Sequence, residues 1–172
     1  MANFERAVQH TLDLEGGYVN DPADPGGRTI YGISERSFPE EWSIGPPTLQ
    51  RAKEIYKLNF WNPLNLDTFV NQSVALEVFD TAVNCGPRKA GEFLQVAYNF
   101  FAVKKGLPPL VVDGAIGPKT IRAVNDFCRS SASNCRALWA KMNVLQALYY
   151  EAIKNDRFII GWYANRVFGE FD

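Results

Sequence analysis

The chain has 172 residues, of which 47% are hydrophobic and 22% are charged, and its net charge is −1. These values are typical of one folded globular domain, and they exclude an intrinsically disordered chain. A net charge so close to zero gives no sign of a nucleic-acid-binding protein, and no apolar run approaches the ~20 residues that span a bilayer. We therefore expect a monomer with no nucleic-acid partner and no insertion into a membrane.

The charge is divided unevenly along the chain. Residues 1–90 carry 8 basic and 12 acidic side chains, whereas residues 91–172 carry 10 basic and 7 acidic side chains. The second part, with an excess of three positive charges, could face an anionic polymer. Chance scatter over a solvated surface explains the same numbers equally well.

The residue types that usually hold metals or act as nucleophiles do not form a recognisable site. Cys85, Cys128 and Cys135 have no metal-ligand spacing and are expected to be free thiols in a reducing compartment. The only histidine, His10, has no second histidine to share a metal and no Ser or Cys at a nucleophile spacing, so we interpret it as a structural or surface residue. No metal and no cofactor is expected.

The first helix and the loop after it form the most informative stretch. Residues 2–15 have apolar side chains at helical spacing, and Glu15 is the last residue before two glycines that stop a helix. The following segment is dense in Asp, Pro and Gly, which predicts sharp turns with exposed polar groups. Residues 29–33, Thr-Ile-Tyr-Gly-Ile, are β-prone. A carboxylate at a rigid helix end, facing a loop with further carboxylates, suits acid/base chemistry on a glycosidic bond.

The remainder of the chain is predicted to be helical. Trp61 follows the second long helix at a turn, where it is either a core residue or a ring that stacks on a sugar. Asp80 and Asn84 lie one turn apart on an otherwise apolar helix, so they are either structural hydrogen-bonding residues or residues of a cleft. Helices are expected over 34–38, ended by Pro39; over 48–59, with Thr48 as N-cap; over 73–84; over 88–103; from Pro118 to about 127; and from Ser133 or Asn134 onward, with a closing segment over 161–167.

Three motifs carry a resemblance to a known family. Glu-Gly-Gly-Tyr (15–18), followed by Asp-Pro-x-Asp-Pro-Gly-Gly-x-Thr-x-Tyr-Gly-Ile (21–33), resembles the N-terminal signature of the phage-type N-acetylmuramidases of glycoside hydrolase family 108. Asp-Gly-x-Ile-Gly-Pro-x-Thr (113–120) resembles the core of peptidoglycan-binding modules. Gly-Trp-x-x-Asn-Arg-Val (161–167) is similar to the closing segment of the same muramidases.

The resemblance implies a mainly α, lysozyme-like fold with a small β-hairpin next to the catalytic helix end. Because no linker separates the two parts, we expect one domain over residues 1–172. It would contain a catalytic half (1–86) and a helical, peptidoglycan-binding-like half (87–172) that does not fold independently. The implied partner is bacterial peptidoglycan.

The resemblance also implies roles for individual residues. Glu15 takes the place of the catalytic glutamate and would act as the general acid. Asp24 lies nine positions further on, the Glu-to-Asp step of the wider phage-lysozyme pattern, and would be the base or water-positioning carboxylate; Asp21 competes with it. The step from Asp24 to Thr29 is one residue shorter than in that pattern, although Thr29 could still orient a water. The candidate substrate-binding residues are Tyr18, Tyr31, Trp61, Asp80 and Asn84.

The expected function is that of a phage endolysin of the lysozyme type. It would hydrolyse the β-1,4 bond between N-acetylmuramic acid and N-acetylglucosamine. A lytic transglycosylase, which can work with one carboxylate, is the alternative among enzymes. A peptidoglycan-binding or secretion-assisting protein without hydrolysis is the alternative outside enzymes. Since the N-terminus does not have the pattern of a signal peptide, synthesis in the host cytoplasm and action on the cell wall after release are expected.

Overall fold

The computed structural model describes residues 1–15, 17–20, 27–153, 159–167 and 171, and it describes Leu14 and Glu15 by their backbone only. Within these residues the chain forms eight α-helices and one two-stranded antiparallel sheet, which confirms the mainly α fold with a small β-hairpin. No helix in this part of the chain is long and apolar enough to cross a membrane. The elements in chain order are α1 (Phe4–Glu15), β1 (Thr29–Ile30), β2 (Ile33–Ser34), α2 (Pro39–Trp42), α3 (Leu49–Tyr56), the π-helical turn η1 (Lys57–Trp61), the 3-10 turns η2 (Asn62–Leu64) and η3 (Leu66–Thr68), α4 (Gln72–Cys85), α5 (Pro87–Lys104), α6 (Pro118–Ser130), α7 (Ala132–Ile153) and α8 (Ile159–Asn165).

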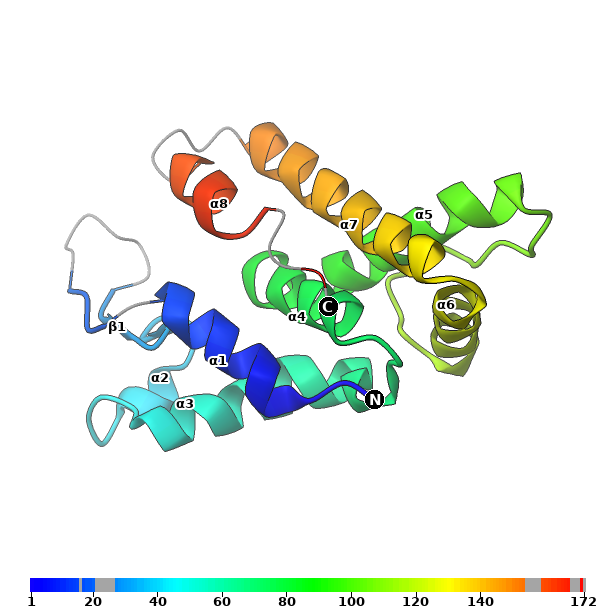
Figure 1. Ribbon diagram of the computed structural model, residues 1–172. Coiled ribbons are helices and arrows are strands. Elements are labelled where there is room, and N and C mark those ends of the chain that lie inside the picture. Colours follow the sequence, from blue (N-terminus) through cyan, green and yellow to red (C-terminus); the bar gives the residue numbers. More distant parts are fainter. Residues whose placement is uncertain (16, 21–26, 154–158, 168–170, 172) are drawn as a thin grey trace.

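Helix α4 lies at the centre of the molecule, between α1 on one side and α5 and α7 on the other (Figure 1). Its first turn is capped by the side chain of Asn71, which accepts a hydrogen bond from the backbone N–H of Val74 at 2.9 Å. It ends at Gly86, whose φ of 89° lies in the left-handed region, and Pro87 then starts α5. Glycine after a helix and proline at its first position are the usual stop and start signals, so the junction is a sharp corner.

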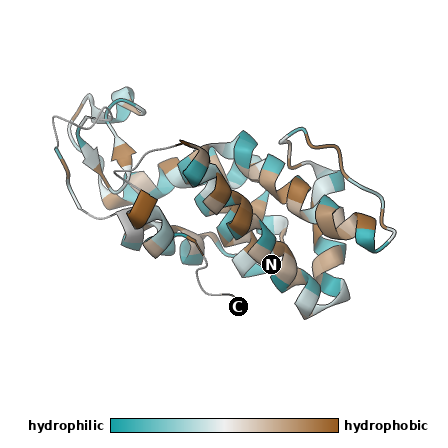
Figure 2. Cartoon of the chain, turned by 90° about the horizontal axis from the view of Figure 1, so that it is seen from above, coloured by the Kyte–Doolittle hydropathy of each residue, from teal (hydrophilic) through white to brown (hydrophobic). Residues whose placement is uncertain are grey.

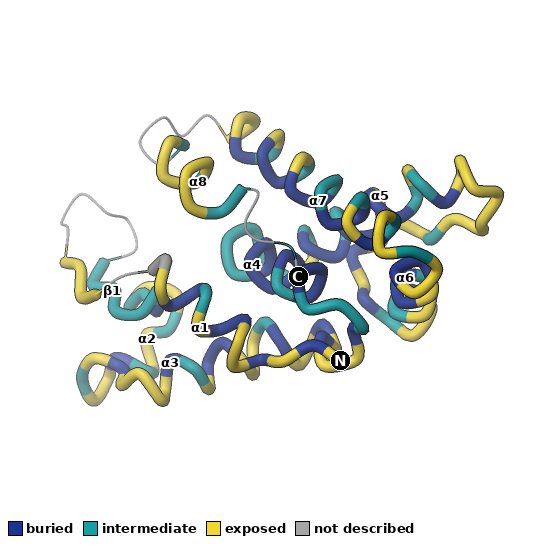
Figure 3. The backbone as a smooth tube through the Cα atoms, in the orientation of Figure 1, coloured by how far each residue is buried: buried dark blue, intermediate teal, exposed yellow. Residues whose placement is uncertain are grey.

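A single hydrophobic core includes residues from both halves of the chain, from Ala2 to Met142. Its densest part is aromatic: Phe79 of α4 contacts Phe4 of α1 at 6.1 Å and Trp61 of η1 at 5.6 Å between ring centroids, both edge to face. Figure 2 shows that most helices carry hydrophobic residues on one side and hydrophilic residues on the other. Figure 3 shows the buried residues concentrated along α4 and the parts of α1, α6 and α7 that face inward. Amphipathic helices around one apolar helix explain this distribution.

Several helices differ from those expected. The helix expected over 34–38 is absent, because Ser34 belongs to β2 and residues 35–37 form a turn. Helix α2 begins instead at Pro39, since the fixed φ and missing N–H of proline suit the first helical position. Thr48 is the N-cap of α3 as predicted, but the helical path continues past Asn59 through η1. Helix α7 begins at Ala132, before either predicted cap, and most of the closing motif is helical in α8.

A buried ion pair joins α8 to α4. Arg166 donates from Nη1 to Oδ1 of Asp80 at 2.6 Å, and the two side chains are 9% and 6% exposed. Gln146 of α7 donates to Oδ2 of the same carboxylate at 3.1 Å. The ring of Trp162 stacks on Tyr150 of α7 with centroids 4.6 Å apart. Charge-assisted hydrogen bonds and aromatic stacking therefore dock the C-terminal helix against the centre of the fold.

Glu77 lies one turn before Asp80 on α4 and is also buried. Asn143 of α7 donates to its Oε2 at 2.9 Å, while Oε1 has no hydrogen-bond partner among the described residues. Burial, and secondarily the charge of Asp80, raises the pKa of Glu77 well above its ordinary value of 4.5. Burial at this position thus favours the neutral carboxyl group over the ionised carboxylate, whose desolvation costs more free energy.

Amide substitution of these two acids should change the free energy of unfolding by different amounts. Asp80→Asn removes the negative charge that pairs with buried Arg166, so the free energy of unfolding should fall by about 3 kcal/mol. Glu77→Gln should lower it less, since burial raises the pKa of Glu77 and so already disfavours its ionised form. Because the pKa of Glu77 is higher in the folded state than in the unfolded state, its contribution to the free energy of unfolding is lost as the pH rises above 4.5 toward the folded-state pKa. Urea unfolding of both variants across pH tests this, and a greater loss of stability for Glu77→Gln than for Asp80→Asn would contradict it.

The shared core predicts that cutting the chain near Gly86 does not release two folded domains. Each piece would expose the apolar face that α4 or α5 buries against the other. We expect residues 1–86 alone to lack a cooperative thermal transition in circular dichroism. Cooperative unfolding together with activity in that fragment would refute the single-domain prediction.

Candidate active site

The backbone of Glu15 is positioned by α1, which is fixed at its other end to the start of α4. Ala2 donates its N–H to the carbonyl of Phe69 at 2.8 Å. The backbone of Asn3 exchanges two hydrogen bonds with the side-chain amide of Gln72, at 2.6 and 3.1 Å. A helix held in this way provides a rigid support for its last residue. The side chain of Glu15 itself lies outside the described part of the structure.

The segment after Glu15 is closed by a short antiparallel bridge. Val19 and Thr29 exchange both backbone hydrogen bonds, each 2.8 Å long. The loop between them therefore starts and ends at the edge of the hairpin, and it follows α1 in the chain. Asp21 and Asp24 both belong to this loop but lie outside the described residues, so their roles and the Glu15–Asp24 separation stay predictions.

The β-prone segment forms a hairpin with a two-residue turn. Thr29 pairs with Ser34 and Ile30 with Ile33, and the turn residues Tyr31 and Gly32 have φ angles of 51° and 74°. Two positive φ values are the signature of a type I′ turn, whose twist matches that of the strands. Tyr56 of α3 donates its hydroxyl to the carbonyl oxygen of Tyr31 at 2.9 Å, which ties the turn to the helical core.

The same register brings together an ion pair that the sequence reasoning missed. Arg28 donates from Nε and Nη2 to the two carboxylate oxygens of Glu35, at 2.9 and 2.7 Å, and its guanidinium lies 5.0 Å from the ring centroid of Trp42. Arg28 holds the pKa of Glu35 below its ordinary value, chiefly by hydrogen bonding. Glu35 is thus suited to an ion pair and not to general-acid catalysis. Extending the pairing outward from the Tyr-Gly turn would have matched positions 28 and 35.

Three further candidates lie on or beside this hairpin. Tyr18 is 52% exposed, so its ring is available to a ligand. Tyr31 is half-buried at the turn. The hydroxyl of Thr29 donates to the carbonyl of Gly27 at 3.4 Å, a weak bond that leaves it free to contact a water. The structure therefore gathers Tyr18, Thr29 and Tyr31 in the segment that follows the end of α1.

Of the other three candidates, Trp61 and Asp80 are buried and Asn84 is half-buried. Trp61 is fully buried, with its ring 5.5 Å from Phe4 and its Nε1 donating to Asp67 at 2.8 Å, which favours the core alternative. No face of this ring is open to a sugar. Asn84 donates to the backbone and, at 3.4 Å, to the carboxylate of Asp80, which is the group that pairs with α8. The ion pair of Asp80 favours the structural alternative for that residue, whereas Asn84 stays a candidate of either kind.

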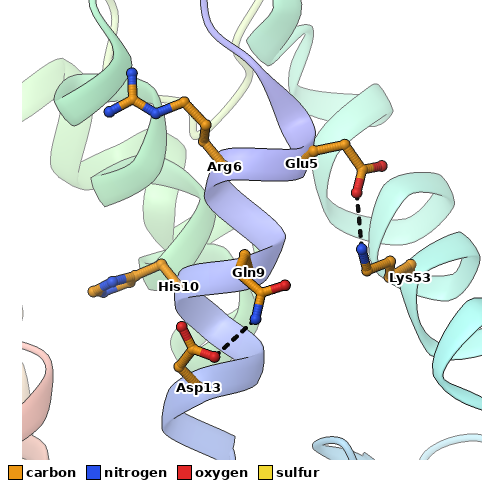
Figure 4. Close-up of a pocket in the computed structure, with 6 residues that line it drawn as sticks. All are labelled: Glu5, Arg6, Gln9, His10, Asp13 and Lys53. Atoms are coloured by element: carbon orange, nitrogen blue, oxygen red, sulfur yellow. Dashed lines mark hydrogen bonds and ion pairs between the residues drawn. The ribbon is translucent and has the colours of Figure 1, made fainter.

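A hollow of about 520 Å³ on the outer face of α1 contains the only histidine (Figure 4). Its polar residues pair among themselves: Lys53 with Glu5 at 2.9 Å, and Gln9 with Asp13 at 2.8 Å. Figure 4 shows the imidazole of His10 directed away from the carboxylate of Asp13. Among the described residues there is no group of three His, Cys, Asp or Glu side chains that could hold a metal. The hollow offers neither a metal site nor an activated nucleophile.

The second motif, residues 113–120, organises a loop in the second half of the chain. Gln95, a buried residue of α5, accepts hydrogen bonds from the N–H groups of Asp113 and Gly114 and donates to the side chain of Asp113 and the carbonyl of Ala115. This loop passes so close to α5 that a Cβ atom on Gly91 would lie 2.0 Å from the carbonyl oxygen of Gly114. Gly114 itself has a φ of 79°, in the left-handed region. Glycine is required at both positions. The motif therefore fixes this loop to α5.

Known proteins are similar to this chain in both halves. The family model of glycosyl hydrolase 108 matches residues 8–86, and that of the predicted peptidoglycan domain matches residues 92–167. The solved structure of Brucella abortus SagA is 28% identical, with a TM-score of 0.71, over 94% of this chain and 87% of SagA. No curated protein is similar enough to count as a relative. The two family matches indicate a glycosyl hydrolase that acts on peptidoglycan. The chain is thus similar to the glycosyl hydrolase 108 family in its first half and to the predicted peptidoglycan domain in its second half.

Proposed function

We propose that this protein is an N-acetylmuramidase that hydrolyses the β-1,4 bond between N-acetylmuramic acid and N-acetylglucosamine. The observation that carries the proposal is the place of Glu15: it is the last residue of a firmly anchored helix, inside the part of the chain that matches glycosyl hydrolase 108. A carboxylate at a rigid helix end suits a reaction that needs one proton donor at a fixed position.

In the proposed mechanism Glu15 protonates the glycosidic oxygen as the bond to the leaving sugar breaks. Asp24, or Asp21 in its place, acts as base or positions the water that attacks the anomeric carbon. Thr29 would orient that water, and the exposed ring of Tyr18 and the half-buried Tyr31 would contact the sugar. The bridge between Val19 and Thr29 supports this assignment, since it closes the acid-bearing loop next to the catalytic helix.

The biological setting proposed is that of an endolysin. The protein would act as a monomer, be made in the host cytoplasm and reach the peptidoglycan after release. Its second half supports binding of the same polymer, because residues 92–167 match the peptidoglycan domain and carry most of the positive charge.

Replacing Glu15 by Gln should abolish lysis without unfolding the protein. Loss of a general acid lowers a rate by about a hundredfold or more. A helix-end carboxylate contributes little to folding, so the melting temperature should stay nearly unchanged. The measurement is the fall in turbidity of outer-membrane-permeabilised cells. The matched control is Asp13→Asn, which removes an exposed carboxylate from the same helix and should lyse at the wild-type rate. Lysis at the wild-type rate by folded Glu15→Gln protein would contradict the assignment of Glu15 as the general acid.

The products distinguish hydrolysis from transglycosylation. A hydrolase adds water and leaves a reducing N-acetylmuramic acid end, whereas a transglycosylase uses the muramic 6-hydroxyl and leaves an anhydro end. We expect the reducing product, because the loop after Glu15 supplies carboxylates that can activate water. Mass spectrometry of the released muropeptides measures this.

The Asp24→Ala variant refines the same experiment. It should release muropeptides much more slowly than the wild type, with Asp21→Ala as the matched comparison. Predominantly anhydro products would overturn the hydrolase proposal. Reducing products formed at the wild-type rate by Asp24→Ala would keep the reaction but remove the role of Asp24.

A further inference from the structure

A groove of about 720 Å³ lies in the second half of the chain, separate from α1 and the hairpin. It is formed by α5, the loop after α5 and α6, all inside the match to the predicted peptidoglycan domain. Its volume is in the range of ligand-binding pockets. Its lining includes Tyr98, Pro108, Pro109, Lys119, Arg122 and Phe127.

The wall of the groove is fixed before any ligand binds. The side chain of Asn99 donates to the carbonyl of Leu110 at 2.8 Å and accepts from its N–H at 2.7 Å. Tyr98 donates its hydroxyl to the carbonyl of Pro108 at 3.4 Å, and Gln95 fixes the next part of the loop. A preformed wall lowers the entropic cost of binding, because the loop is already ordered.

The chemistry of the wall is apolar. Pro108 and Pro109 have no backbone N–H, and the carbonyls of Pro108 and Leu110 are already hydrogen-bonded. The rings of Tyr98 and Phe127 are only 3% and 2% exposed, so they offer no open face on which a sugar could stack. Such a wall suits methyl groups better than the many hydroxyls of a glycan strand.

Two cations lie at this apolar groove. Lys119 and Arg122 are exposed residues in the first two turns of α6, and neither has an acidic partner within 4 Å among the described residues. The one carboxylate of the lining, Asp126, is 3.4 Å from Arg129. The positive end of the α6 dipole adds to the potential of these two side chains. An anion with apolar substituents would complement the groove.

We propose that this groove binds the stem peptide of peptidoglycan, and not its glycan strand. The stem peptide carries carboxylates on its γ-linked D-glutamate and at its end, which match Lys119 and Arg122, and alanine methyl groups, which match the apolar wall. The inference rests on the proposed function in one respect, that peptidoglycan is the substrate. The groove would hold the polymer by its peptides while the glycan strand reaches the catalytic half.

The test is direct binding of the tripeptide L-alanyl-γ-D-glutamyl-meso-diaminopimelate to the full chain, followed by nuclear magnetic resonance and calorimetry. Peptide-free glycan strands are the second probe. The wild type should bind the tripeptide with shifts at groove residues, and Lys119→Gln/Arg122→Gln should weaken it by about tenfold or more. The matched control, Lys104→Gln/Lys105→Gln, removes the same charge from the nearby end of α5 and should change affinity by less than about twofold.

Several outcomes would overturn the inference: no binding of the tripeptide, binding of glycan strands that the groove variant weakens, or equal losses in both double variants. The single variants Lys119→Gln and Arg122→Gln decide the matter if the double variant does not fold. Hydrolysis of sacculi is measured on the same wild-type preparation. Hydrolysis without tripeptide binding removes this inference alone, whereas tripeptide binding without hydrolysis removes the proposed function alone.

Discussion

The packing of α4 against two different sets of helices is the constraint on which this structure depends. One side of α4 contacts α1 and η1, which carry the aromatic cluster around Phe79, and the other contacts α5 and α7. An apolar helix buried on all sides cannot be exposed without a large loss of hydrophobic free energy. The half that matches the glycosyl hydrolase and the half that matches the peptidoglycan domain therefore share one core.

Buried polar groups add specificity to this apolar contact. Asp80 on α4 pairs with Arg166, the residue directly after α8, and Glu77 pairs with Asn143 on α7. Burial of an ion pair contributes little net stability, because desolvation offsets much of the attraction. Its geometry, however, allows only one position of α8 to satisfy both charges. We interpret these contacts as the reason that the C-terminal helix docks in one register against α4 and α7.

The two proposed sites use the same device, a functional segment held by a rigid helix. In the first half, α1 ends at Glu15 and the hairpin beside it is fixed by Tyr56 and by the Arg28–Glu35 pair. In the second half, Asn99 and Gln95 fix the loop that forms one wall of the groove. Polymer hydrolysis benefits from such a division, since contacts distant from the reacting bond position the substrate at the catalytic acid.

The sequence alone determined the local features of this protein. Apolar periodicity predicted α1, and Thr48 was correctly predicted as the N-cap of a helix. The Tyr-Gly pair is compatible with the tight hairpin turn that it forms, and the motifs indicated the family. Only the tertiary structure decided which side chains meet. It placed Trp61 in the core, paired Asp80 with a residue 86 positions away, and matched Arg28 with Glu35. The physical reason is that helix and turn signals act over a few neighbouring residues, whereas burial and pairing depend on how distant helices pack.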